Sequence, residues 1–580
     1  MKIHNQFLKL YQLHAGTDEL SVTLGEIAGV LDCTQRNALM IIRKMESRGW
    51  ISWQARRGRG RRSQLTFLIG PGEVAAESMI QAVERREIKQ AVDDIRTYAR
   101  SASMQEHLQG WLLQYFGHHT TRGEGQSQVD TLRIPLRQQL HTFDPLSINL
   151  LAESFVTSHI FDGLVRRDEC GRILPHLALG WEISEDRTRW SFVLRKEVFF
   201  HNGKLLAADD VVFSIRRLMQ SSGRMLYSFI VRNILSVQAS GPSEVEFTLK
   251  EPNELFLPFL CTSRAVIVPR ELDHHPPAVF ARSPVGTGPF KLADSDQGLC
   301  VLEVFRQYFR GRAQLDRVEI VQLPWNLGSD EEDSPDQTSP FHIIHHPTTP
   351  GTTSSSGGNS SGSHIQSGSY VRKFITFNTQ KTGPLQDTAI RASICRMLEM
   401  DRFNRDSDAA FRDNIKPGSS GSLPLPVELT LATIPQYRQE ARTLADLLER
   451  NGCSCRLNVL SVEAFKGSSR MEADLILFSL IRDQDMHLRQ YDLYETLAGH
   501  VEPHSRIDIE RLLRQAAQTY EEAARTDCFL QIEERLIQAH QLHILYERPV
   551  QTAYLPSVRG VSFNSQGWVD LRHIWFPPKR

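Results

Sequence analysis

The sequence has no stretch typical of a membrane span or an export signal. No apolar run approaches the roughly 20 residues that a helix needs to cross a bilayer. The first residues, MKIHNQFLKLYQLHAG, are interrupted by polar side chains and lack the apolar segment of a signal peptide. We therefore expect a cytoplasmic protein with no membrane partner.

Cysteine is also scarce: the 580 residues contain eight, and the only closely spaced pair is Cys453 and Cys455. Such scatter does not predict a disulfide framework. The pair lies in ERNGCSCRLNVL, where we interpret both thiols as packing or surface groups rather than metal ligands or redox groups. The length exceeds what one hydrophobic core supports, so several domains are expected.

Net charge is nearly absent as well, at −1, but it is unevenly distributed. Residues 1–70 contain eleven Lys and Arg against five Asp and Glu. Five of these arginines lie in the short stretch QARRGRGRRSQL, between Arg56 and Arg62. A basic N-terminal segment on a mildly acidic body indicates an anionic partner for that segment.

The basic stretch follows a pattern typical of a winged helix-turn-helix. Apolar residues at helical spacing predict one helix in VTLGEIAGVL, which Asp32 and Cys33 interrupt. Thr34 can cap a second helix, TQRNALMIIRKMESR, which Gly49 ends. Two strand-like runs, WISWQARR and SQLTFLI, then enclose a Gly/Arg turn. Residues 1–70 are therefore predicted to be a DNA-binding domain.

The second helix of such a domain enters the DNA major groove with its N-terminal end. Arg36 suits guanine, and Gln35 or Asn37 suits adenine, by hydrogen-bond geometry. Arg43 and Lys44 are better placed for phosphates, and the wing would hold phosphates or enter a minor groove. The predicted DNA-binding residues are Thr34, Gln35, Arg36, Asn37, Arg43, Lys44, Arg56, Arg57, Arg59, Arg61 and Arg62. RNA binding and a solvated basic hairpin are the alternatives.

Residues 72–117 predict a helical connector, because apolar residues recur at i+3 and i+4 through this segment. The stripe favours packing on a neighbouring domain, and a homodimer seam is the alternative. The polar, glycine-rich GHHTTRGEGQSQ that follows is interpreted as a linker, and His118 and His119 as part of it rather than as metal ligands.

Residues 129–580 predict an α/β body, with strands, turn signals and capped helices such as AADDVVFSIRRL. An acidic and then Ser/Gly-rich stretch at about 329–369 predicts a disordered insertion. It contains His342, His345 and His346 and a GNSSG motif at 358–362. A catalytic elbow would need a strand and a helix around that motif. We therefore expect no enzyme, no catalytic residue, no metal and no cofactor.

Five ordered stretches of the body resemble the family 5 extracellular solute-binding proteins. They are IFDGLV, ILPHLALGWEIS, WSFVLRKEVFFHNGKLLAADDVVFSIRRL, PVGTGPFKL and FNTQKTGPLQDTAIRASICRML. The resemblance implies a bilobal, periplasmic-binding-protein-like domain of type II, in which a solute lies between two lobes that close by a hinge. Joined to the basic segment, the whole chain resembles the SgrR family of transcriptional regulators.

This resemblance implies a cytoplasmic regulator whose solute-binding-like domain senses a sugar, a sugar phosphate or a peptide and modulates DNA binding. An importer receptor for oligopeptides with an atypical N-terminus is the alternative. Phe143 and Asp144, after the first strand of the body, are candidate cleft residues. In the family that the body resembles, a carboxylate after a Gly-Trp often binds the amine of a peptide. Asp483 and Asp485 are candidates for this carboxylate by their place in the resemblance, although the Gly-Trp is missing here. The identity of the solute stays open, and so does the choice between activation and repression of transcription.

Overall fold

The structure is a computed structural model, and it divides into two compact units. One comprises residues 1–140, 292–303 and 315–342, and the other comprises 141–291, 304–314 and 343–580. The described residues are 2–13, 19–56, 62–71, 73–74, 116–122, 128–136, 140–148, 151–168, 170–221, 225–274, 277–296, 298–322, 343–347, 363–406, 427–482, 486–554, 558–562 and 569–577. Most of the predicted connector, 72–117, lies outside them.

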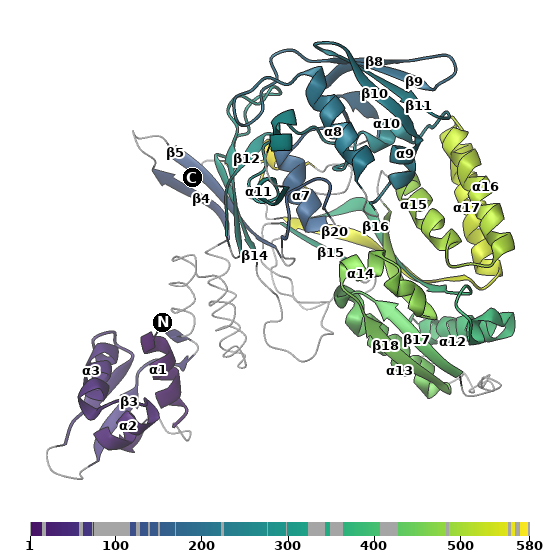
Figure 1. Ribbon diagram of the computed structural model, residues 1–580. Coiled ribbons are helices and arrows are strands. Elements are labelled where there is room, and N and C mark those ends of the chain that lie inside the picture. The colour runs from purple at the N-terminus through teal and green to yellow at the C-terminus, as the bar shows by residue number, and fades with distance from the viewer. Residues whose placement is uncertain are drawn as a thin grey trace. The chain divides into compact units, whose positions relative to one another are not determined.

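The N-terminal segment is a winged helix (Figure 1). Its elements are α1 (Lys2–Tyr11), β1 (Glu19–Val22), α2 (Leu24–Val30), α3 (Gln35–Glu46), β2 (Ile51–Gln54) and β3 (Ser63–Phe67). The strands form an antiparallel sheet in the order β1-β3-β2. The two predicted helices and the hairpin are confirmed, and α1 and β1 are additional.

Helix α1 completes the core of this domain. Phe7 is fully buried, and its ring meets Trp50 edge-on, with 5.7 Å between the ring centroids. Ile3, Phe7 and Leu10 recur at helical spacing and are all buried. That spacing is a sequence signal for the helix.

A five-stranded sheet also belongs to the first unit, in the order β12-β13-β14-β5-β4. Its strands are β4 (Gly117–Arg122), β5 (Gln128–Leu136), β12 (Phe290–Asp296), β13 (Leu299–Val304) and β14 (Arg317–Gln322). The predicted linker is therefore wrong over 117–122, which form an edge strand paired with β5. His118 Nε2 lies 3.0 Å from Asp130 Oδ1 and helps to lower the pKa of that carboxyl, although partial burial opposes the shift.

The second unit contains two modules, of which the first is a four-stranded antiparallel sheet in the order β10-β11-β9-β8. Its strands are β8 (Ala178–Ile183), β9 (Arg189–Leu194), β10 (Ile234–Gly241) and β11 (Glu244–Leu249). Trp190, Phe192 and Leu194 alternate with exposed residues along β9 and enter one core. The predicted helix AADDVVFSIRRL is α8 (Ala208–Gln220), which contacts β10 and carries buried residues of the same core.

Shorter elements accompany this module. They are α7 (Leu151–Ile160), β6 (Val165–Arg167), β7 (Ile173–Pro175), α9 (Ser228–Asn233), α10 (Phe256–Phe259), η2 (Arg270–His274) and α11 (Pro277–Phe280). Gly286 and Gly288 cross the end of α7 so closely that a Cβ on either would lie within 2.7 Å of the Ile160 carbonyl oxygen. This contact explains the glycines of PVGTGPFKL, because only glycine fits there.

The second module is a six-stranded sheet in the order β15-β20-β16-β19-β17-β18. Its strands are β15 (Ile343–Pro347), β16 (Ser363–Phe377), β17 (Val427–Thr433), β18 (Cys453–Val459), β19 (Leu475–Arg482) and β20 (Leu542–Tyr554). One core joins it to α12 (Thr388–Asp406) and α13 (Arg438–Arg450), and a second joins it to α15 (Met486–Ala498), α16 (Pro503–Gln518) and α17 (Glu522–Gln538).

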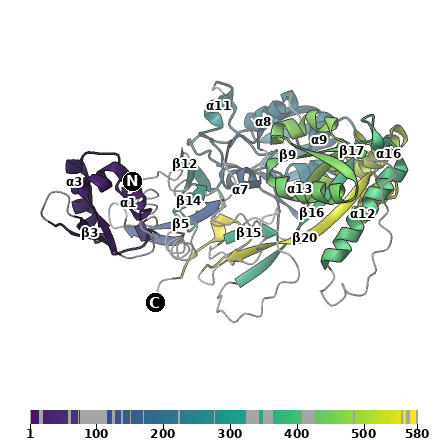
Figure 2. The same cartoon turned by 90° about the horizontal axis from the view of Figure 1, so that it is seen from below.

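Two stretches of the predicted disordered insertion are strands. Ile343–Pro347 form β15, and β16 begins at Ser363, so His345 and His346 are strand residues. Both strands pair with β20, which lies beside β16 along its length (Figure 2). Pairing with a distant strand satisfies the backbone of these polar residues, which local composition does not reveal. Residues 329–342 and 348–362, including His342 and GNSSG, lie outside the described residues.

Cys453 and Cys455 are buried packing residues of β18, in the core that includes α13. Burial raises the pKa of the Cys455 thiol to about 12. Across the described part of the chain, no group of three or more His, Cys, Asp or Glu is arranged to hold a metal ion.

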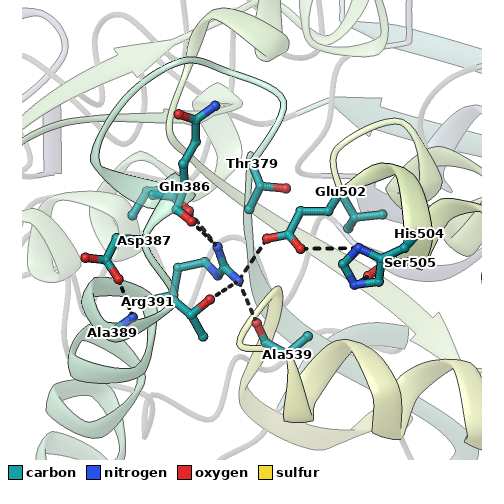
Figure 3. Close-up of polar contacts among 12 residues, drawn as sticks. Thr379, Gln386, Asp387, Ala389, Arg391, Glu502, His504, Ser505 and Ala539 are labelled. Carbon is teal, nitrogen blue, oxygen red and sulfur yellow. Dashed lines mark hydrogen bonds and ion pairs between the residues drawn. The ribbon is translucent and has the colours of Figure 1, made fainter.

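A buried arginine ties the helices of the second module together (Figure 3). Arg391, in the first turn of α12, donates to the carbonyl oxygens of Leu385 (2.8 Å), Gln386 (3.2 Å) and Ala539 (3.2 Å). Its guanidinium also lies 3.2 Å from Glu502, the residue just before α16. One side chain thereby links α12, α16 and the end of α17.

Candidate DNA-binding surface and solute-binding residues

The turn before α3 is defined by two residues. Asp32 adopts a left-handed conformation with φ of 51°, which aspartate tolerates better than most residues. Thr34 then caps α3, because its hydroxyl accepts a hydrogen bond from the Asn37 amide at 3.3 Å. Thr34 is exposed but has this structural role, which the sequence also predicted.

Helix α3 has one buried face and one exposed face. Ala38, Ile41, Ile42 and Met45 are buried in the domain core. The predicted DNA-binding residues of the helix lie on the other face, and all are exposed: Gln35, Arg36, Asn37, Arg43 and Lys44. The structure therefore brings together the side chains that the sequence assigned to bases and phosphates.

The wing is described only at its base. Strands β2 and β3 pair up to Gln54 and Gln64, and Arg56 and Arg62 are exposed just beyond them. Arg57, Arg59 and Arg61 lie outside the described residues. The Arg62 guanidinium donates to Glu26 Oε1 at 2.9 Å, which places this arginine beside the start of α2.

Glu26 has two roles at that point. It accepts a hydrogen bond from the Thr23 amide at 2.8 Å, and its own amide donates to the Thr23 hydroxyl, so the two residues cap α2 reciprocally. The bond from the Thr23 backbone, and then Arg62, lower the pKa of this carboxyl. Arg62 must leave an exposed ion pair to meet a phosphate, and such pairs are weak.

The loop after β5 places the first two candidate solute residues in buried positions. Phe143 and Asp144 are each 4% exposed. The Asp144 carboxylate accepts two hydrogen bonds from Arg217 of α8, at 2.9 and 2.5 Å, and a third from the Leu146 amide at 3.0 Å. Asp144 therefore orders the loop through Arg217, a partner that the sequence analysis did not identify.

Arg264 holds the same loop from the other side. Its guanidinium donates to the carbonyl oxygens of Pro145 (3.0 Å), Leu146 (2.7 Å) and Ile148. Burial lowers the pKa of Arg264, and Asp492 and Glu153 oppose that shift. The guanidinium is therefore fixed on the 140–148 loop, and the charges of Asp492 on α15 and Glu153 on α7 act on it.

Lys466 is the residue of the second module that Arg264 acts on electrostatically. It ends α14 (Val462–Lys466), and burial followed by Arg264 lowers the pKa of its amine to about 8. Glu463, Asp492 and Glu153 oppose that shift, so acidic groups of both modules act on the same amine. We call Glu153, Arg264, Lys466 and Asp492 the inter-module cluster. Sequence reasoning missed it because its members come from four distant segments.

Direct contacts join the modules next to this cluster. Asp492 accepts a hydrogen bond from the Tyr227 amide at 2.8 Å. The ring of the neighbouring Tyr491 stacks on Phe229, with 3.7 Å between centroids. About one turn further along α15, Glu495 pairs with Arg232 at 2.5 Å. In Figure 1 these contacts lie where α9 meets α15. The candidates Asp483 and Asp485 lie outside the described residues.

Two family profiles match the chain. Residues 2–122 match the N-terminal domain of sugar transport-related sRNA regulators, and residues 172–396 match the middle part of the bacterial extracellular solute-binding proteins, family 5. No helix in the described ranges is long and apolar enough to span a membrane.

Relatives match over nearly the whole chain. An uncharacterised protein of Bacillus subtilis, YhjP, is 27% identical over 590 residues, which cover 96% of both chains. The HTH-type transcriptional regulator SgrR of Yersinia enterocolitica is 26% identical over 611 residues, covering 100% of this chain and 99% of the relative. SgrR of Pectobacterium atrosepticum matches to the same extent, at 26% over 605 residues.

Solved structures share the fold of the body. DppA of Helicobacter pylori, in complex with the peptide STSA, superposes with a TM-score of 0.61 at 20% identity, covering 77% of this chain and 98% of that one. NikA of Brucella suis, in complex with Fe(III)-EDTA, gives 0.62 at 18% identity, covering 77% and 100%. The predicted fold class, a winged helix-turn-helix with a periplasmic-binding-protein-like domain, is therefore confirmed.

Fold and surface together define a class: a DNA-binding winged helix joined to a family 5 solute-binding fold. This is a class of transcriptional regulators, not of enzymes. Within it, the chain is similar over its whole length to HTH-type transcriptional regulators named SgrR, at 26% identity.

Proposed function

We propose that this regulator senses a small solute with its family 5 domain and that the solute changes its affinity for duplex DNA. The observation that carries the proposal is the exposed polar and basic face of α3, on a winged helix joined to a solute-binding fold. A solute can shift DNA binding only if it binds two states of the protein with different affinities.

On DNA, Arg36 reads guanine, and Asn37 or Gln35 reads adenine, because these side chains match the donors and acceptors of those bases. Arg43 and Lys44, further along α3, hold phosphates. Arg56, Arg57, Arg59, Arg61 and Arg62 of the wing bind the backbone or a minor groove.

The solute is proposed to bind at the inter-module cluster. Glu153 is 1% exposed and Arg264 is 4% exposed, so an acidic and a basic side chain are both buried there. Desolvated charges of fixed position discriminate strongly between ligands. A sugar phosphate or a peptide matches them in charge, and a sugar matches them by hydrogen bonds. Phe143 and Asp144 support the adjoining loop, and Asp483 and Asp485 lie close in sequence to Asp492.

The domain division follows the same proposal. Residues 1–70 bind DNA, residues 72–117 connect, and residues 129–580 form the solute-binding-like domain, while β4 (Gly117–Arg122) pairs with its first strand, β5. A regulator of this kind works in the cytoplasm, where its DNA is. The apolar stripe of the connector is proposed to pack on a neighbouring domain; the alternative is a homodimer seam, which would present two recognition helices to a two-fold operator.

A thermal-shift screen of the full-length chain tests the solute site. A solute that binds only the folded protein stabilises it, by about 2.7 kcal/mol at a hundredfold excess over Kd. We expect a sugar, sugar phosphate or peptide to raise the melting temperature of the wild type. Lys466→Met should abolish that rise, while Lys196→Met, at an exposed position of the same unit, should keep it. An equal rise in all three proteins would contradict the placement of the site.

A further inference from the structure

The solvent face of α3 carries one apolar side chain among its polar ones. Met40 is 63% exposed. Arg36 and Asn37 precede it by one turn, and Arg43 and Lys44 follow it by one turn. All four neighbours are exposed, so Met40 stands at the centre of the surface assigned to DNA.

Met40 has no place in the core of the winged helix. The apolar cluster of this domain includes Met45, which is fully buried one and a half turns later, but not Met40. Exposed apolar residues are common on protein surfaces, so the exposure of Met40 means little by itself. Its position on the recognition helix carries the inference.

The major groove presents one apolar group, the C5-methyl of thymine. Methionine is unbranched and flexible and carries a polarisable sulfur, so it adapts to an apolar partner without a fixed fit. Arg, Asn and Lys around it can bind the polar edges and phosphates, but none offers an apolar end to a methyl group.

We propose that Met40 reads a thymine by contacting its C5-methyl group, and so sets sequence preference at that position. The proposal rests on the proposed entry of α3 into the major groove. Met40 lies about 6 Å further along the helix axis than Arg36. Since base pairs are spaced by about 3.4 Å, the thymine should lie within about two base pairs of the guanine that Arg36 reads.

Deoxyuridine substitution isolates this contact, because uracil differs from thymine only by the missing methyl. Binding sites are first selected from random duplexes with the full-length wild type. Each thymine of the selected site is then replaced by deoxyuridine, and Kd is measured for the wild type and for Met40→Ala. At one thymine, the wild type should lose about fourfold in affinity, the value of one buried methyl group.

Met40→Ala should lose affinity for the thymine site and show no further loss with deoxyuridine there. Met40→Leu keeps an apolar side chain and should retain the preference for thymine. Leu68→Ala, at a 57% exposed position outside α3, should behave as the wild type. Melting curves of each variant check that the fold is unchanged.

Two failures are distinguishable. If wild type and Met40→Ala respond alike to deoxyuridine at every thymine, the role of Met40 is refuted and DNA binding stands. If the full-length chain selects no duplex at all, the proposed function and this inference fall together.

Discussion

At the scale of single residues, we expect the stability of the second module to depend on the buried guanidinium of Arg391. Its guanidinium bonds to the carbonyls of Leu385 and Gln386 before α12 and of Ala539 after α17, and pairs with Glu502 before α16.

Arg391→Ala should therefore destabilise the protein by about 1–3 kcal/mol, because buried carbonyls lose their donors. Arg396→Ala, on the exposed side of the same helix, is the matched control and should stay within about 0.5 kcal/mol of the wild type. Urea unfolding of both variants measures the difference. Equal midpoints would show that the carbonyls find other donors.

In the proposed function, Arg36 is the residue on which base recognition most depends. Arg36→Ala should cost about 1–3 kcal/mol of DNA binding and relax preference at one operator position. Competition between operator variants in a mobility-shift assay measures that loss of preference. Lys9→Ala removes an exposed positive charge from α1 and should leave preference intact. Full sequence discrimination by Arg36→Ala would mean that α3 is not the reading helix.

The lowered pKa of Lys466 leads us to expect that solute binding depends on pH. Its amine has a pKa of about 8, lowered by burial and by Arg264, so the empty protein loses this proton above pH 8. A solute that places a carboxylate or phosphate on the ammonium should therefore bind best below pH 8. Its affinity should fall about tenfold per pH unit well above that value. Calorimetry between pH 6.5 and 9.5 measures it. The decline should vanish in Lys466→Met, and a flat wild-type profile would contradict an anionic contact there.

At the scale of elements, the wing and α3 should respond differently to salt. If Arg62 holds a phosphate as proposed, Arg62→Ala should weaken binding to all sequences alike. It should also lower the slope of log affinity against log salt by about 1. Titrations at several salt concentrations, with operator and unrelated DNA, measure both effects. A loss confined to the operator would show that Arg62 reads sequence instead.

Elements with strong local signals could be predicted, and elements held by distant partners could not. Helices α2 and α3 follow from an apolar stripe, the Thr34 cap and Gly49, all within one short stretch. The sequence of β4 is typical of a polar linker, and the start of β16 is typical of a disordered segment. Both form strands because they pair with β5 and β20, respectively. Polar strands owe their structure to backbone pairing, which composition does not record.

The candidate sites divide in the same way. The exposed face of α3 could be predicted because it is the complement of a visible apolar stripe. The inter-module cluster could not, because Glu153, Arg264, Lys466 and Asp492 lie far apart in the chain. The buried pair of Asp144 and Arg217 likewise appears only once the loop and α8 are folded together.

At the scale of the whole molecule, sensing requires two states of the protein that the solute binds with different affinities. The contacts of Tyr227, Phe229 and Arg232 with Asp492, Tyr491 and Glu495 join the modules beside the inter-module cluster. A solute bound there would strengthen or replace them. That change must then reach the winged helix through the connector, whichever direction of regulation results.

The most direct test is calorimetric titration of the solute into the full-length chain, with and without its selected operator DNA. Allosteric couplings of about 1–3 kcal/mol correspond to a 5- to 150-fold change in affinity. Linkage requires the same factor in both directions. We therefore predict that operator DNA changes the Kd of the solute by the factor by which the solute changes the Kd of the operator. Equal solute affinities with and without DNA would contradict the proposal that this regulator is a sensor.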